Sequence, residues 1–221
     1  MIDSSIFALV DHTLLSPTAT WEDIKSVCNE AIQYSTASVC IPPSFVKQVS
    51  GAYGTSLNIC TVIGFPLGYA TTESKIAEII DADTNGANEF DVVINQGDVK
   101  DGNFDKITSE LTALKKAIGS KVLKVIIECC NLTDGEKVAL CDCVTKSNAD
   151  YIKTSTGFGT GGATLADIKL FKQHIGQNVK IKAAGGMKTK DDFIAFINEG
   201  CARLGTSSAV KVLTGQGASG Y

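Results

Sequence analysis

The chain has 221 residues, of which 44% are hydrophobic and 20% charged, a composition that supports one large core and argues against a disordered chain. The formal net charge of -4 and the lack of a Lys/Arg-rich run argue against a nucleic-acid-binding protein. The eight cysteines include no Cys-x-x-Cys pair, and no apolar run reaches membrane-spanning length. We therefore expect no structural zinc, no membrane segment, reduced thiols and a cytoplasmic protein.

Short runs typical of buried strands alternate with longer stretches of helical periodicity along the chain. The predicted strands are 7–10, 38–41, 58–63, 89–93, 122–127, 151–153, 179–183 and 203–205. The predicted helices are 20–34, 44–53, 72–85, 104–118, 134–147, 165–175, 190–199 and 207–213. This alternation indicates repeated βα units.

Eight βα units in a chain of 221 residues predict an α/β fold, a closed (β/α)8 TIM barrel formed by one domain over residues 1–221. The glycine-rich tail from about residue 214 to 221 is expected to be flexible. An open doubly wound sheet is the alternative. In a barrel, the residues that end the strands form a ring around one mouth, and here these are Asp11, Cys40, Gly64, Asp91, Glu128, Lys153, Lys182 and Gly205.

Two lysines, Lys153 and Lys182, end the sixth and seventh predicted strands, which are neighbours in a barrel. Two ammonium groups about 4 Å apart repel by roughly 4 kcal/mol at an effective dielectric constant of 20, which leaves Lys153 partly neutral near pH 7. A neutral amine attacks an aldehyde, and the resulting iminium withdraws electrons from the adjacent carbon. The alternative is a pair of structural lysines that extend to solvent.

Eight short motifs stand around these strand ends. In chain order they are DHTLL (11–15), SVCI (38–41), VIGFPLG (62–68), FDVVIN (90–95), KVIIE (124–128), YIKTSTG (151–157), KAAGG (182–186) and RLGTSS (203–208). These local sequences resemble those of deoxyribose-phosphate aldolases, a family of class I (β/α)8 aldolases, over essentially the whole chain.

The resemblance implies reversible cleavage of 2-deoxy-D-ribose 5-phosphate to D-glyceraldehyde 3-phosphate and acetaldehyde. Lys153 would form the Schiff base, and Lys182 would perturb its pKa. Asp91 would relay protons through a bound water, although a helix cap or a structural ion pair is the alternative for this residue. Tyr221, at the end of the tail, would reach back to assist proton transfer, unless the tail is simply a frayed terminus.

Glycine backbone and serine groups after strands six to eight are the expected phosphate ligands. The candidates are Gly157, Gly185, Gly186, Gly205, Ser207 and Ser208. Phe158 stands where some family members carry a lysine, and Pro42-Pro43 replaces the commoner single proline, so both loops depart from the family pattern. Supporting roles are expected for Asp11, Thr13, Cys40 and Glu128.

Two distant histidines and scattered thiols offer no convergent zinc site, so we expect no metal and no cofactor. The expected partners are a small phosphorylated sugar and acetaldehyde, without nucleic acid or membrane, and the resemblance leaves a homo-oligomer open. Two alternatives remain at this point: a non-catalytic sugar-phosphate-binding barrel, and another Schiff-base enzyme such as a transaldolase.

Overall fold

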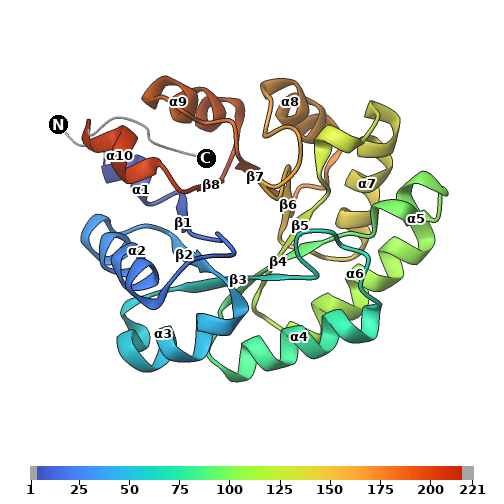
Figure 1. The fold of residues 1–221 in the computed structure, drawn as a ribbon. Coiled ribbons are helices and arrows are strands. Elements are labelled where there is room, and N and C mark those ends of the chain that lie inside the picture. The colour runs from blue at the N-terminus through green and yellow to red at the C-terminus, as the bar shows by residue number, and fades with distance from the viewer. Residues whose placement is uncertain (1–3, 216–221) are drawn as a thin grey trace.

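Eight parallel strands close into a barrel within residues 4–215, the part of the chain that the structure, a computed structural model, describes. Each strand pairs with the next one in the chain, and β8 pairs with β1. In Figure 1 the strands form a central ring with the helices outside it. The strands are β1 (Val10–Thr13), β2 (Ser38–Ile41), β3 (Ile59–Ile63), β4 (Glu89–Val93), β5 (Val122–Ile126), β6 (Tyr151–Lys153), β7 (Lys180–Ala184) and β8 (Arg203–Thr206). The predicted (β/α)8 barrel is confirmed.

Five of the ten α-helices in the described residues begin at a threonine cap. The ten are α1 (Ser4–Phe7), α2 (Trp21–Tyr34), α3 (Val46–Tyr53), α4 (Thr72–Thr84), α5 (Gln96–Lys100), α6 (Phe104–Ile118), α7 (Asp134–Lys146), α8 (Leu165–His174), α9 (Lys190–Glu199) and α10 (Ala209–Thr214). A threonine side chain accepts a backbone hydrogen bond at the start of α2, α4, α7, α8 and α9, which satisfies an N–H group that has no partner inside the helix. None of these helices is long and apolar enough to cross a membrane.

The first predicted strand, 7–10, is wrong. Phe7 instead ends helix α1, where its ring stacks on Tyr34 with the centroids 4.8 Å apart, and the strand runs over Val10–Thr13. The apolar run before Asp11 suggested a strand because buried strands are usually apolar. The actual strand is polar because the inside of this barrel is charged.

The other seven strands lie within one residue of their predicted bounds at each end, and the eight predicted helices differ from the observed ones by at most two residues at either end. Helices α1 and α5 were not predicted. The double proline is accommodated by a short 3-10 helix, η1 (Pro43–Phe45), which leads into α3. Pro43 occupies its first position, where a backbone N–H is not needed.

The barrel carries charged side chains on its inner face and apolar ones on its outer face. In β4, Phe90 and Val92 belong to the main apolar core, whereas Glu89 and Asp91 are buried and charged. Because successive strand residues point to opposite faces, the two carboxylates share the interior. Buried charges need partners, and the partners of these two define the site described below.

Candidate active site

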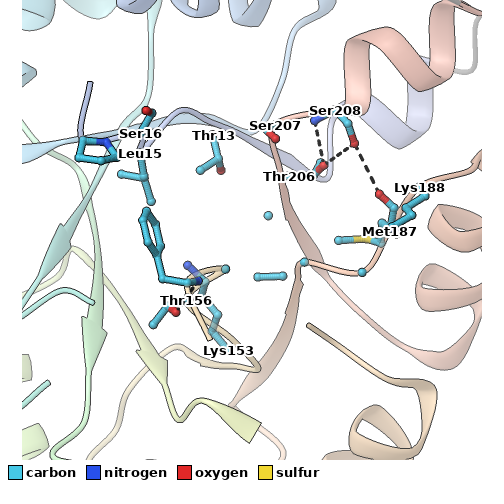
Figure 2. Close-up of a pocket in the computed structure, with 17 residues that line it drawn as sticks. Thr13, Leu15, Ser16, Lys153, Thr156, Met187, Lys188, Thr206, Ser207 and Ser208 are labelled. Atoms are coloured by element: carbon cyan, nitrogen blue, oxygen red, sulfur yellow. Dashed lines mark hydrogen bonds between the residues drawn. The ribbon is translucent and has the colours of Figure 1, made fainter. Parts of the chain in front are cut away.

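A cavity of about 580 Å³ opens at the C-terminal ends of β1, β6, β7 and β8. Figure 2 shows its wall, with Lys153 on one side and the segments that contain Met187 and Ser208 on the other. Eight of the residues predicted from the sequence line it: Thr13, Lys153, Gly157, Gly185, Gly186, Gly205, Ser207 and Ser208. Of the eight residues predicted to ring the mouth of the barrel, only Lys153 and Gly205 line this cavity.

Lys153 joins the cavity to the barrel interior. It is the last residue of β6 and is only 3% exposed. Its side chain lines the cavity, and its Nζ donates a hydrogen bond to Asp91 Oδ2 at 2.7 Å. An aldehyde in the cavity would meet this amine from the open side.

Lys182 lies directly beside Lys153, because their Cα atoms are register partners on β6 and β7. Its Nζ donates to Asp91 Oδ2 at 2.6 Å and to Asp11 Oδ2. Burial alone lowers the pKa of Lys182, but the carboxylates of Asp11 and Asp91 outweigh burial and raise it. Lys182 therefore stays charged at neutral pH, is fully buried, and does not line the cavity.

Asp91 is the middle residue of β4, not its end, because the strand continues to Val93. Its Oδ2 accepts from both Lys153 and Lys182, and its Oδ1 accepts from Lys124 Nζ at 2.9 Å. Burial opposes a negative charge there, but neighbouring lysines, Lys124 foremost, hold the pKa of Asp91 well below its usual range. The two predicted site lysines thus meet on one oxygen of an ionised carboxylate.

Lys124 is a site residue that the sequence reasoning missed. It is fully buried, is the register partner of Asp91, and also contacts Glu89 Oε2 at 2.6 Å and Asp11 Oδ2 at 3.3 Å. The available signal was a lone lysine inside the apolar run of β5, since a charge in a buried strand needs a partner.

Arg203 and Glu89 complete the charged interior. Arg203 Nη1 donates to Asp11 Oδ1 at 2.5 Å and to Glu89 Oε2 at 2.9 Å. Ser38 adds a hydrogen bond to Asp11 Oδ1 at 2.6 Å. Asp11, for which the sequence suggested a supporting role, is thus a hub that links Lys182 and Lys124 to Arg203.

Two groups of three side chains bring atoms that could ligate a metal close to one another. One group is Cys40, Cys60 and Asp91, and the other is Asp11, Cys60 and Glu89. Lys124 Nζ stands 3.1 Å from Cys60 Sγ and also within hydrogen-bond distance of Asp91 and Glu89. Its ammonium group already supplies these donor atoms with the positive charge that a metal ion would bring. The donor set therefore does not fit a resident metal.

Glu128 holds the loop that follows Lys153. It is buried, has a left-handed backbone (φ 55°), and its carboxylate accepts hydrogen bonds from the Thr156 backbone N–H and hydroxyl. Thr156 Oγ1 in turn accepts the N–H of Phe158 at 2.9 Å. Glu128 does not line the cavity, so its contacts support a positioning role.

The remaining supporting candidates divide between the wall and the interior. Thr13 lines the cavity, and its hydroxyl donates to Asp11 O at 2.8 Å. Cys40 is fully buried beside Cys60 and Val62 and does not reach the cavity, so its thiol is not exposed at a strand end. Tyr221 lies outside the described residues.

The far wall of the cavity contains the predicted phosphate loops. Gly185 and Gly186 both have left-handed backbones (φ 73° and 81°), which favour glycine, and a Cβ at Gly162 would collide with the Gly185 backbone. Helix α10 begins at Ala209 instead of Ser207, because the Ser208 N–H turns back to Thr206 Oγ1 at 3.0 Å. The Ser207 end of this wall is exposed and faces the cavity.

Phe158 and Lys188 also line the cavity. The Phe158 ring is 52% exposed and meets Phe65 edge to face, with the ring centroids 5.4 Å apart. Lys188, on the loop after β7, is an exposed cation that the sequence reasoning did not select. At the position after Gly157 this chain therefore has an aromatic wall, and a cation faces the cavity from the next loop.

The fold and site define a class: a (β/α)8 barrel with a lysine amine at its mouth, backed by a charged lysine and a shared carboxylate. A family model described as DeoC/LacD family aldolase matches residues 5–219, and the chain belongs to this family. Among its relatives, the deoxyribose-phosphate aldolase of Clostridium botulinum (strain Eklund 17B / Type B) is 61% identical over 100% of both chains. The deoxyribose-phosphate aldolase of Clostridioides difficile is 56% identical over 98% of this chain and 99% of its own.

Solved structures agree with this membership. A putative deoxyribose-phosphate aldolase from Coccidioides immitis has a TM-score of 0.92 and 34% identity, covering 96% of this chain and 86% of that chain. A tetrameric deoxyribose phosphate aldolase from Aeropyrum pernix has a TM-score of 0.89 and 32% identity, covering 96% of this chain and 91% of that chain. The protein is an aldolase, and its enzyme class is a carbon–carbon lyase.

Proposed function

We propose that the chain cleaves 2-deoxy-D-ribose 5-phosphate reversibly into D-glyceraldehyde 3-phosphate and acetaldehyde through a Schiff base on Lys153. The observation that carries the proposal is the position of Lys153, whose amine borders the cavity while sharing Asp91 Oδ2 with Lys182. Relatives at 61% and 56% identity that carry the name of this activity support it.

In the proposed reaction, the neutral Lys153 amine attacks C1 of the open-chain aldehyde, and loss of water from the carbinolamine gives an iminium. A base removes the proton of the C3 hydroxyl, and the C2–C3 bond breaks as its electrons move into the iminium. D-Glyceraldehyde 3-phosphate leaves, and the enamine takes a proton at its terminal carbon. Water then hydrolyses the iminium, which releases acetaldehyde and restores the amine.

Asp91 and Lys182 have different parts in this proposal. Lys182 is the fixed charge that disfavours a second ammonium group at Lys153. Asp91 is the ionised acceptor between them, and it relays protons through a water when Lys153 passes through the uncharged carbinolamine. We also propose that Tyr221 assists protonation of the enamine, a role that rests on the resemblance to the family.

The phosphate would lie against Gly185, Gly186, Gly205, Ser207 and Ser208, with Gly157 across the cavity. Lys188 adds a positive charge to this wall. Its side chain is exposed, so its interaction with a phosphate is partly screened by water.

Replacing Lys188 by methionine should raise KM for 2-deoxy-D-ribose 5-phosphate about 5- to 10-fold, with little change in kcat, because a charge-assisted contact is lost. Unphosphorylated 2-deoxy-D-ribose should be cleaved by the variant and the wild type alike. Steady-state kinetics with both sugars check this, and Lys190→Met, an exposed lysine that does not line the cavity, is the matched control. Equal losses with both sugars would contradict a phosphate contact.

The proposed function is tested by incubating the wild-type protein with 2-deoxy-D-ribose 5-phosphate and measuring both products. We expect equimolar acetaldehyde and D-glyceraldehyde 3-phosphate, at a rate that EDTA does not change. A wild-type protein that binds the sugar phosphate without turnover would favour a non-catalytic binding barrel. Loss of activity in EDTA would contradict an amine-based mechanism.

Two further parts of the proposal concern assembly and location. The Aeropyrum pernix relative is a tetramer, and we propose a homo-oligomer for this chain as well. All eight cysteines are free, which supports a reducing compartment such as the cytoplasm.

A further inference from the structure

Seven charged side chains meet inside the barrel and form one connected cluster, called here the charge cluster. Its members come from six strands and are Asp11, Glu89, Asp91, Lys124, Lys153, Lys182 and Arg203. Four of these groups are cations and three are carboxylates. If all were ionised, the cluster would hold one positive charge too many, and an uncompensated charge in a buried site is strongly unfavourable.

The contacts identify the cation with the least compensation. Lys124 contacts three carboxylates, and Lys182 and Arg203 contact two each. Lys153 contacts only Asp91, on the oxygen that Lys182 also uses. Lys153, the member that lines the cavity, is therefore the cation of the charge cluster with the fewest carboxylate partners.

Other titratable groups lie near the charge cluster. Burial raises the pKa of Cys60 on β3 well above its usual range. The Glu128 carboxylate accepts hydrogen bonds from Thr156 and, among the described residues, forms no ion pair with a member of the charge cluster. Lys180 on β7 and Lys188 on the cavity wall are exposed. A hydrogen bond with Cys60 lowers the pKa of the Cys40 thiol on β2, and the Cys40→Ser variant below tests whether this thiol enters the count. The Tyr151 ring on β6 faces the Arg203 guanidinium at 5.5 Å.

We propose that Arg203, which does not touch the cavity, is the positioning residue whose fixed charge makes the charge cluster one cation in excess and so keeps Lys153 uncharged and reactive. The inference rests on the proposed function of Lys153 as the nucleophile. A guanidinium suits this task because it does not deprotonate in proteins and its fork binds two carboxylates at once. Glu89, the partner of Arg203, carries a negative charge and so lowers the net charge of the charge cluster by one.

The charge count makes predictions of opposite sign for two variants. Arg203→Met removes a positive charge, so Lys153 keeps its proton to higher pH and the acid limb of the kcat/KM profile moves up by about one pH unit, a roughly tenfold loss on that limb. Glu89→Gln removes a negative charge, so the acid limb moves to lower pH. The double variant removes one charge of each sign and should return the limb to the wild-type position.

Arg203→Lys and Cys40→Ser are the controls. Arg203→Lys keeps the charge while losing the fork, so its acid limb should stay in place even if its turnover falls. Cys40→Ser should also leave the limb in place. A shift of the Cys40→Ser limb to lower pH would mean that a thiolate already balances the fourth cation, which would overturn the count.

The same variants are examined by borohydride trapping of acetaldehyde across pH, with the fraction of adduct on Lys153 measured by mass spectrometry. Adduct formation should follow the same opposite shifts. If Arg203→Met does not fold, Glu89→Gln and Arg203→Lys still test the proposal. The proposal is overturned if the acid limb of Glu89→Gln does not move to lower pH. It is also overturned if the acid limb of Arg203→Lys moves to higher pH. If Glu89→Gln does not fold, an acid limb of Arg203→Met that stays at the wild-type position overturns the proposal.

The wild-type assay separates the failure of this inference from the failure of the proposed function. A wild-type protein without turnover or a Lys153 adduct contradicts the proposed function itself. A wild-type protein with turnover and a defined acid limb, whose single-charge variants keep that limb, contradicts only the role of Arg203. In that case Arg203 serves the structure of the barrel alone.

Discussion

Lys153→Met should lower kcat/KM for 2-deoxy-D-ribose 5-phosphate by at least about 10⁴-fold, because no other described amine borders the cavity beside Asp91. Loss of the nucleophile removes the covalent route, and binding contacts alone cannot replace it. The assay is steady-state release of acetaldehyde at saturating and limiting substrate.

The Lys153→Met protein should remain folded. Without Lys153, three cations face three carboxylates in the charge cluster, so the variant leaves no buried charge unpaired. Thermal unfolding and far-UV circular dichroism check this, and Lys169→Met, an exposed lysine on α8, is the control for the loss of a lysine elsewhere. A folded Lys153→Met protein with wild-type turnover would contradict the proposed nucleophile.

Lys182→Met is expected to have the second largest effect on turnover, a loss of about 10²- to 10³-fold near neutral pH. The variant removes the charge that lies beside Lys153, so the remaining cations and carboxylates balance and Lys153 keeps its proton. Because the loss arises from protonation, raising the pH should recover part of the activity. The measurement is a pH profile of kcat/KM.

Lys182→Met should also destabilise the fold by about 3–5 kcal/mol, since Asp11 and Asp91 lose a buried partner. Lys75 offers a matched control: it is likewise fully buried and pairs with Glu110 at 2.6 Å, but it lies outside the cavity and the charge cluster. Lys75→Met should lose comparable stability while keeping the pH profile. Identical pH profiles for wild type and Lys182→Met would contradict the role of Lys182.

The position of the two lysines was predictable from the sequence because each lies near the end of its predicted strand, and strand order makes the sixth and seventh strands neighbours in a parallel barrel. Lys153 and Lys182 lie on these consecutive strands, and the structure pairs them in register. The cavity wall followed from the same rule, since barrel sites gather at the C-terminal ends of the strands. Eight of the predicted residues line it.

The charge cluster beneath the cavity was not predictable in the same way. Its members depend on the register between strands, which pairs Asp91 with Lys124, and on long side chains such as Arg203 that cross the barrel interior. A single sequence does not give register. The same charged interior explains why the first strand was predicted at 7–10. The strand itself, β1, is polar and contains Asp11, whereas the prediction chose the apolar run before it.

The role of Tyr221 stays a prediction, because the residue lies outside the described part of the chain. Phe158 stands where some family members carry a lysine. Its ring packs against Phe65, and Lys188 on another loop places a cation on the cavity wall. The phosphate assignments rest on the backbone of Gly185 and Gly186 and on the serines after β8.

In the proposed mechanism, Lys153 forms the Schiff base while Lys182 remains a charged neighbour. The most direct measurement is to treat the wild-type protein with acetaldehyde and borohydride at neutral pH and to locate the reduced N-ethyl group by peptide mass spectrometry. We predict a single modification on Lys153, with Lys182 unmodified. An N-ethyl group on Lys182, or an enzyme that turns over substrate without any trapped adduct, would contradict this mechanism.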